Sequence, residues 1–281
     1  MTFPLVEGVH YHRKQGRPPG AAEKRRIPLM TVGKIAAMAA ALVFIAAVPL
    51  GLMIWLNRKR GARWLPFLIG VVFFPVFAMM LEPLLHVAVL SSPLGPLMQN
   101  NVWIYGLYGG LAAGLFEETG RLVAFKVVLR NETEPVTALS YGLGHGGMEA
   151  LLVVGTAMIN NLLMGVLLLN GGQPPAELAA AAETLTATPT VMFLWSALER
   201  ASAVLIHVSN SVLVFAAVRT GKWALFPAAI LLHAALNFLA VVSGAYLPVA
   251  AVEIMILVFA LLAGLWAAKI YRSDLKNCET P

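Results

Sequence analysis

The sequence predicts an all-α membrane protein: a polytopic helical bundle of about seven transmembrane helices, with eight as the alternative count. Of the 281 residues, 59% are hydrophobic and 12% are charged, and the mean hydropathy is +0.78. These values are typical of a protein that crosses a membrane repeatedly, not of a soluble domain. Apolar runs long enough for a helical crossing recur along the chain, and lysine and arginine gather in every second loop between them.

Seven segments meet the requirement of about 20 apolar residues per crossing. In chain order they are 33–56, 64–90, 101–128, 136–168, 190–217, 222–242 and 248–270. Pro75 and Pro83 predict kinks in the second segment, because proline removes a helical hydrogen bond. The fourth segment is longer than one crossing, so we expect it to be tilted, broken near Asn160 and Asn161, or followed by a re-entrant piece. The stretch 171–189 is the only sizeable loop between segments.

We divide the chain into a basic tail (1–32), one transmembrane domain (33–272) and a C-terminal tail (273–281). Basic residues in the first, third and fifth loops predict a cytoplasmic C-terminus and, for seven crossings, an external N-terminus. The basic N-terminal tail conflicts with an external position. We expect either a biological start at Met30, which we favour, or an eighth crossing. The single cysteine, Cys278, excludes an intramolecular disulfide and a cysteine metal cluster.

The third segment carries charges that membrane anchoring does not require. Glu117, Glu118 and Arg121 lie within five positions of each other in an otherwise apolar run. A charged side chain at the centre of a membrane helix costs roughly 2.5 to 3.5 kcal/mol on insertion scales. Three such residues need a network of partners or a function, so we expect a functional site inside the membrane.

Four ionisable residues are expected at one depth. Glu117, His145, His207 and His233 each lie about nine to eleven residues from the cytoplasmic end of their segment. At a rise of 1.5 Å per residue they lie roughly 15 Å deep, near the middle of the bilayer. Four helices therefore deliver one ionisable group each to the same plane.

Residues three or four positions apart share one face of a helix. The pairs placed together in this way are Arg121 with Glu117 or Glu118, His145 with Glu149, His207 with Asn210, and His233 with Asn237. Arg121 can neutralise either acid, and Glu149 is a candidate to orient His145. The glycines and alanines of 106–114 predict a face for close helix packing. We expect a structural or gating role for a second polar tier nearer the outer leaflet, formed by Glu82, His86, Glu199 and Arg200.

This set of side chains favours hydrolysis by acyl transfer. A carboxylate beside imidazoles can deprotonate water, and a histidine with an asparagine amide can stabilise an oxyanion. Other intramembrane protease chemistries are poorly supported, because the only aspartate is Asp274 in the tail. The sequence also contains no His-Glu-x-x-His and no Gly-x-Ser-x motif. The charged cytoplasmic helix ends suggest that water enters from the inner face.

The ordered motifs resemble a known family. They are Glu117-Glu118-Thr119-Gly120-Arg121, Tyr141-Gly142-Leu143-Gly144-His145 and His233-Ala234-Ala235-Leu236-Asn237 on successive membrane segments. From about Met30 to Arg272 the chain resembles the YhfC family of glutamate-type intramembrane proteases, related to PrsW and to the type II CAAX prenyl endopeptidase and bacteriocin-processing families. The resemblance implies that residues 33–272 form a protease-like domain.

The resemblance also implies residue roles. It implies that the first glutamate of the pair, Glu117, activates water and that Arg121 is its electrostatic partner. His145, His233 and Asn237 would be oxyanion and water ligands. Depth and spacing add His207 to this set. Glu-Glu-x-x-Arg has the PrsW spacing, whereas CAAX-type enzymes place the arginine one residue further on, so the resemblance does not carry over a prenylated substrate.

We expect a multi-pass protein of the cell membrane, in a bacterium the cytoplasmic membrane, that acts on a membrane protein or a lipidated peptide and binds no nucleic acid. A carboxylate-activated water needs no metal, so we predict no cofactor. Three histidines and a glutamate are also possible zinc ligands. A tightly bound metal at these histidines would contradict the metal-free first step.

Two other functions use the same residues. A metal or proton transporter would need the acids and histidines as an ion path, and only a transporter predicts flux across sealed vesicles. A non-catalytic membrane scaffold would tolerate Glu117→Gln.

Overall fold

The computed structural model describes residues 29–275, which consist of helices and turns without a strand. The α-helices in chain order are α1 (Val32–Arg60), α2 (Trp64–Phe74), α3 (Glu82–Leu90), α4 (Gly95–Gln99), α5 (Val102–Val123), α6 (Val136–Ala150), α7 (Thr156–Leu169), α8 (Ala179–Ala187), α9 (Thr190–Thr220), α10 (Leu225–Tyr246) and α11 (Val249–Ile270). π-Helical turns at Pro75–Leu81, Ala124–Val128, Leu151–Gly155 and Tyr271–Leu275 and a 3₁₀ turn at Ala176–Leu178 complete the list.

The expected polytopic bundle is confirmed. Within residues 29–275, six helical segments are long and apolar enough to cross a membrane. They are Val32–Arg60, Trp64–Leu90, Val136–Leu169, Thr190–Thr220, Leu225–Tyr246 and Val249–Ser273. Helix α5 has a similar length of 22 residues, but Glu117, Glu118 and Arg121 lower its apolarity below that of the other six. The count of seven crossings therefore depends on α5.

Irregular turns interrupt two of the long segments. The expected distortion at Pro75 is confirmed, because a π-helical turn begins there and α3 starts afresh one residue before Pro83. In the long fourth segment the irregular turn is Leu151–Gly155, and a break near Asn160 and Asn161 is wrong, since α7 runs through both residues. Asn160 is exposed on this helix, so its side chain does not require a break.

The packed structure extends slightly beyond the expected transmembrane domain of residues 33–272 at both ends. Met30 is buried against α1 and α7 neighbours, and the Thr31 side chain accepts a hydrogen bond from the Lys34 N–H at the start of α1. At the other end Leu275 is buried in the cluster that contains Val212. The alternatives for the basic N-terminus, and residues 276–281, lie outside the described residues.

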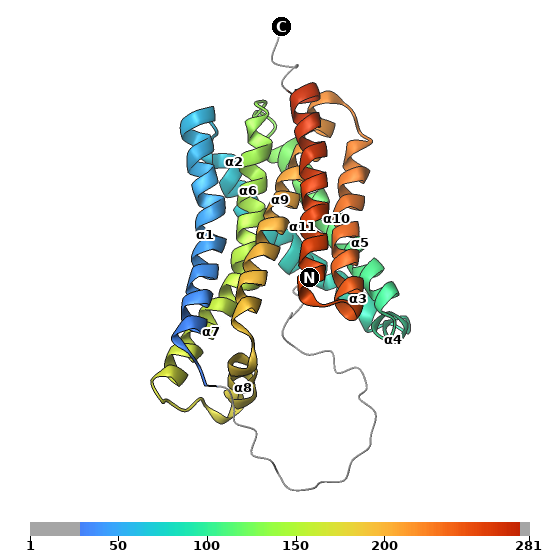
Figure 1. The fold of residues 1–281 in the computed structure, drawn as a ribbon. Coiled ribbons are helices and arrows are strands. Elements are labelled where there is room, and N and C mark those ends of the chain that lie inside the picture. Colours follow the sequence, from blue (N-terminus) through green and yellow to red (C-terminus); the bar gives the residue numbers. More distant parts are fainter. Residues whose placement is uncertain (1–28, 276–281) are drawn as a thin grey trace.

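The basic helix ends lie together. Figure 1 shows the end of α1, the α5–α6 and α9–α10 connections and the end of α11 at the top of the bundle. These ends carry Arg60, Arg130, Arg219 and Lys269. The α7–α9 connection, α4 and the α10–α11 connection lie at the opposite end. The alternating basic loops predicted from the sequence thus fall on one face, which the positive-inside rule assigns to the cytoplasm. We call it the basic end.

Helix α9 is the centre of the bundle, with 78% of its most apolar window buried against 17–28% for the other five candidate spans. Small residues bring its neighbours close. A Cβ at Gly142 of α6 would lie 2.6 Å from Cα of Val208 on α9, and one at Gly110 of α5 would lie 2.5 Å from the Ala234 carbonyl oxygen on α10. Side chains at these positions would push the helices apart, so the glycines set how near opposing polar groups approach.

Candidate functional site

Four helices converge on one buried polar cluster, as the common depth predicts. Helix α5 contributes Glu117, Glu118 and Arg121, α6 contributes His145 and Glu149, α9 contributes His207 and Asn210, and α10 contributes His233. Apart from Glu149, each of these residues is at most 4% exposed. We call them the central cluster.

Glu117 faces three imidazoles. Its Oε2 lies 2.9 Å from Nε2 of His145, which is hydrogen-bond distance. Its Oε1 lies 3.8 Å from Nε2 of His233, and its Oε2 lies 3.8 Å from Nδ1 of His207. The two longer separations are too wide for hydrogen bonds. Glu117 is therefore held by one histidine and retains a free acceptor position between the other two.

Glu118, the adjacent residue, is fully occupied. Its Oε2 pairs with Arg121. Its Oε1 accepts a hydrogen bond of 2.9 Å from the Asn210 amide and lies 2.8 Å from Nδ1 of His233. A buried carboxylate with a cation and two further donors is well stabilised but has little capacity left for a ligand. Glu118 therefore organises the cluster, whereas Glu117 is available for chemistry.

In two of the histidines, the ring nitrogen that points away from Glu117 contacts a carboxylate. Glu118 holds Nδ1 of His233, and Glu149 contacts Nε2 of His207. A carboxylate accepts, so each anchored nitrogen carries the hydrogen and the opposite nitrogen presents a lone pair toward Glu117. At His207 that nitrogen receives an N–H of Arg121 at 3.1 Å.

Glu149 occupies a different place from the one that its spacing predicts. It lies on α6 one turn from His145, yet its side chain contacts His207 on α9. Arg200, also on α9, donates to Glu149 at 2.9 Å and to Glu199 at 2.6 Å. The expected Glu149–His145 pair is thus replaced by a chain from Glu199 through Arg200 and Glu149 to His207.

The expected His207–Asn210 pair does not form, because the Asn210 amide donates a hydrogen bond to Glu118 instead. Asn237 lines the same cavity as His233 and is half-buried, with no side-chain hydrogen bond to another described residue. His145 is supported by Tyr141, whose hydroxyl lies 3.5 Å from Nδ1, and by the edge of Phe74.

The second polar tier separates into two parts. Glu199 and Arg200 connect to the central cluster through Glu149. Glu82 and His86 form their own pair at 2.9 Å on α3, and the Tyr108 hydroxyl of α5 lies 2.8 Å from the other nitrogen of His86. We call Glu82, His86 and Tyr108 the outer pair site.

The donor set of the central cluster is compatible with a metal ion. One ligand atom from each of Glu117, His207 and His233 lies within 4.8 Å of the others, and all three residues are buried. Imidazole and carboxylate are ordinary zinc ligands. Metal-binding histidines usually donate their second N–H to a carboxylate, as His207 and His233 do here. An ion at Nδ1 of His207 would replace Arg121 as that atom's partner.

Comparisons with known proteins match the part of the chain that contains the central cluster. A family model described as YhfC intramembrane metalloprotease matches residues 44–259, which include the whole central cluster. The chain is 35% identical over 249 residues to a Bacillus subtilis (strain 168) protein named "Uncharacterized membrane protein YhfC", covering 84% of this chain and 95% of that one. No solved structure matches. The chain is thus a multi-pass membrane protein that belongs to the YhfC intramembrane metalloprotease family.

Proposed function

We propose that this protein is an intramembrane endopeptidase in which Glu117 binds and activates the hydrolytic water. The observation that carries the proposal is the difference between the two adjacent glutamates. Glu118 uses both oxygens in strong contacts, whereas Glu117 keeps an acceptor position that faces His207 and His233. A carboxylate in that position can take a proton from water.

Each neighbouring residue has a role that follows from its contacts. His145 holds the Glu117 carboxylate through the contact of 2.9 Å. The water oxygen attacks the peptide carbonyl carbon while Glu117 accepts the water proton, which then passes to the departing amine. The Asn237 amide, which lines the same cavity as His233, is placed to donate a hydrogen bond to the oxyanion. The Nε2 lone pair of His233, which faces Glu117, is placed to accept a hydrogen bond from the water. Arg121 neutralises Glu118 and so keeps the acidic pair from carrying two uncompensated charges.

The description of the YhfC family as metalloproteases implies a bound metal ion. Glu117, His207 and His233 would hold it, and a bound divalent cation supplies a water of lowered pKa and polarises a carbonyl oxygen. Glu117 would then be a metal ligand rather than the base, whereas the supports of the two histidine rings are the same in both cases. Glu118 and Glu149 fix the two rings, and the burial of all three donors excludes bulk water from them. Metal binding is therefore a separate measurement from hydrolysis.

The substrate class we propose is a membrane-associated protein, because the site lies on membrane-spanning helices. Comparing protein termini in host-cell membranes tests the proposal. Membranes with the wild type, Glu117→Gln or Glu82→Gln would be analysed by terminal-peptide mass spectrometry at equal amounts of folded protein. Glu82→Gln is the matched control, because it also removes a buried carboxylate beside a histidine.

We expect new termini with the wild type and Glu82→Gln and none with Glu117→Gln. Identical termini in all samples would contradict proteolysis, and a scaffold or transporter would then account for the cluster. Flux of zinc or protons into sealed vesicles separates those two, since only a transporter produces it.

A further inference from the structure

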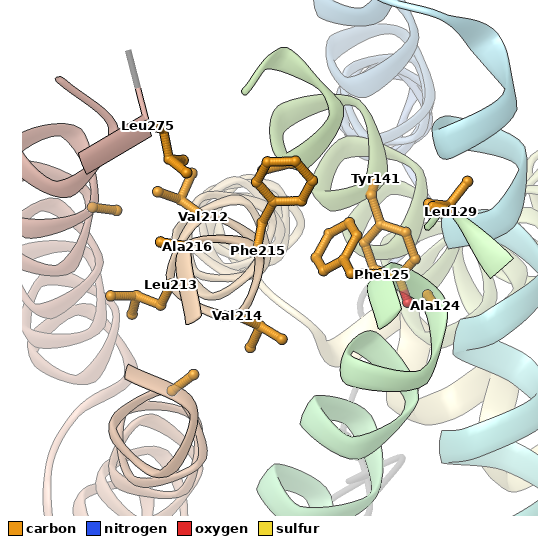
Figure 2. Packing of buried hydrophobic residues seen from close by; sticks show 13 residues of the cluster. Ala124, Phe125, Leu129, Tyr141, Val212, Leu213, Val214, Phe215, Ala216 and Leu275 are labelled. Atoms are coloured by element: carbon orange, nitrogen blue, oxygen red, sulfur yellow. The ribbon is translucent and has the colours of Figure 1, made fainter. Parts of the chain in front are cut away.

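The two flanks of the central cluster along the bundle axis differ. Toward the basic end, the cluster is followed by a layer of large apolar side chains. Phe125 lies 4.9 Å from Tyr141 and 5.1 Å from Phe215, measured between ring centroids, and all three side chains are fully buried. Figure 2 shows these rings between α9 and the helices that carry Phe125 and Tyr141. We call Phe125, Tyr141 and Phe215 the aromatic layer.

Away from the basic end, the cluster opens into a cavity of about 50 Å³. Its polar wall is formed by Glu149, Glu199, Arg200, His207, His233 and Asn237. A water needs roughly 10 to 15 Å³ of such volume, so the cavity accommodates on the order of three waters. The apolar remainder of the wall includes Ala203 of α9 and Ala240 of α10.

Two buried polar atoms in the cavity wall need water as a hydrogen-bond partner. Oε2 of Glu199 and Nε of Arg200 are buried and have no hydrogen-bond partner among the described residues. Buried polar atoms are nearly always hydrogen-bonded, and water is the usual partner where protein groups are lacking. Toward the basic end, Nε of Arg121, Oγ of Ser140 and Oδ1 of Asn210 also lack a partner in the described part of the chain, but the packed rings of the aromatic layer lie on that flank. The difference between the two flanks is therefore the cavity, which gives the polar wall room for water.

Helix direction fixes which side of the membrane this is. Helices α6 and α10 run away from the basic end, and Glu149 and Asn237 follow His145 and His233 by one turn. Helix α9 runs toward the basic end, and Arg200 precedes His207 on it by two turns. Glu149, Asn237 and Arg200 therefore all lie nearer than the histidines to the end of the bundle that is opposite the basic loops.

We propose that water and the scissile bond reach Glu117 through this cavity, from the membrane face opposite the basic loops, and that the aromatic layer closes the site toward the basic end. This inference rests on the proposed function. It names the substrate class as membrane proteins whose scissile bond lies on the external side of the bilayer midplane. It reverses the expectation that water enters from the inner face. The wall carries two carboxylates against one guanidinium, so it disfavours acidic side chains near the scissile bond.

Single cysteines test the access side without any activity assay. In a Cys278→Ser background, Ala203→Cys and Ala240→Cys report on the cavity. Ala124→Cys, at a position that is fully buried and lies beside Phe125 and Tyr141 in Figure 2, reports on the sealed flank. Lys222→Cys and Leu247→Cys mark the two ends of α10, since both positions are exposed. Intact cells and inverted vesicles would be treated with a membrane-impermeant cationic thiol reagent.

We expect the two cavity cysteines to be labelled from the same side as Leu247→Cys, and Ala124→Cys to stay unlabelled from both sides. Labelling of the cavity cysteines from the Lys222→Cys side would overturn the proposal, as would their complete protection from both sides. Labelling of Ala124→Cys from the Lys222→Cys side would show that the aromatic layer does not close the site.

A second measurement connects access to cleavage. Ala240→Trp fills the cavity and should abolish formation of the termini seen with the wild type, whereas Ala240→Gly should retain it. Folding is checked by size-exclusion chromatography in detergent. If labelling follows the expected pattern while no variant or wild type cleaves anything, the proposed function fails and the access path stands. If cleavage occurs and labelling shows the opposite side, only the access path fails.

Discussion

The central cluster and the outer pair site both place a carboxylate against a histidine within a membrane helix bundle, yet they differ in how many helices take part. Glu82 and His86 are neighbours on α3, and His86 also contacts the Tyr108 hydroxyl of α5. In the central cluster every histidine contacts a carboxylate of another helix, and four helices contribute. We therefore expect the local pair to serve helix packing, whereas the convergence of four helices leaves Glu117 with a free acceptor position.

The largest effect is expected from Glu118→Gln, which leaves the buried Arg121 guanidinium without its partner. Removing one partner of a buried ion pair costs about 3 to 5 kcal/mol. We expect a large fall in the unfolding temperature, measured in detergent by intrinsic fluorescence. Glu82→Gln is the matched variant, and its unfolding temperature should fall much less, because the histidine beside Glu82 is not a buried guanidinium. Equal shifts would contradict the organising role of Glu118.

Zinc binding sharpens the comparison between the two sites. The metal-free first step at Glu117 predicts less than stoichiometric zinc in the purified protein, whereas the family description predicts about one zinc per chain, measured by equilibrium dialysis and elemental analysis. If zinc binds, the effects of single substitutions show where it is held. His233→Ala should weaken binding by more than the roughly 10- to 100-fold typical of a residue that only orients a ligand. His86→Ala should leave the stoichiometry unchanged. A wild type without stoichiometric zinc would agree with water activation by Glu117 alone, and stoichiometric zinc lost in His233→Ala would contradict the metal-free first step.

A smaller effect is expected from Glu149→Gln, which weakens the support of His207 without removing the ring. Loss of such an orienting carboxylate typically lowers affinity or activity by about 10- to 100-fold. The readout is the cleavage rate as a function of pH. Glu199→Gln is the control, since Glu199 contacts Arg200 but not His207. Equal effects of the two variants would show that the contact with His207 has no special role.

The smallest effect is expected from His86→Ala. Hydrogen bonds between membrane helices contribute about 0.6 kcal/mol on average, so the unfolding temperature should fall slightly and cleavage should be unchanged. A loss of cleavage comparable to that of Glu117→Gln would remove the distinction between the two sites.

Much of this arrangement could be predicted from the sequence. Apolar length and loop charge placed Glu117, His145, His207 and His233 in one plane, and the structure joins them. The depth of a residue along a helix depends only on counting from the membrane edge. This is why the convergence was predictable before any contact was known.

The partners across helices could not be predicted in the same way. Glu149 shares a helical face with His145 but reaches His207, and Asn210 lies near His207 along α9 but bonds to Glu118. Such contacts depend on how each helix is rotated and how closely its neighbours approach. Glycines such as Gly142 set that approach, and spacing within one helix does not report it.

Cleavage in a reconstituted system tests the central claim most directly. Liposomes would contain only the purified protein and a tagged substrate identified from the membrane termini, and the products would be measured by mass spectrometry. We expect one cleaved bond with the wild type and Glu82→Gln, and a rate with Glu117→Gln lower by roughly 10²- to 10⁴-fold. Cleavage by Glu117→Gln at the wild-type rate, or no cleavage by the folded wild type, would contradict proteolysis at Glu117.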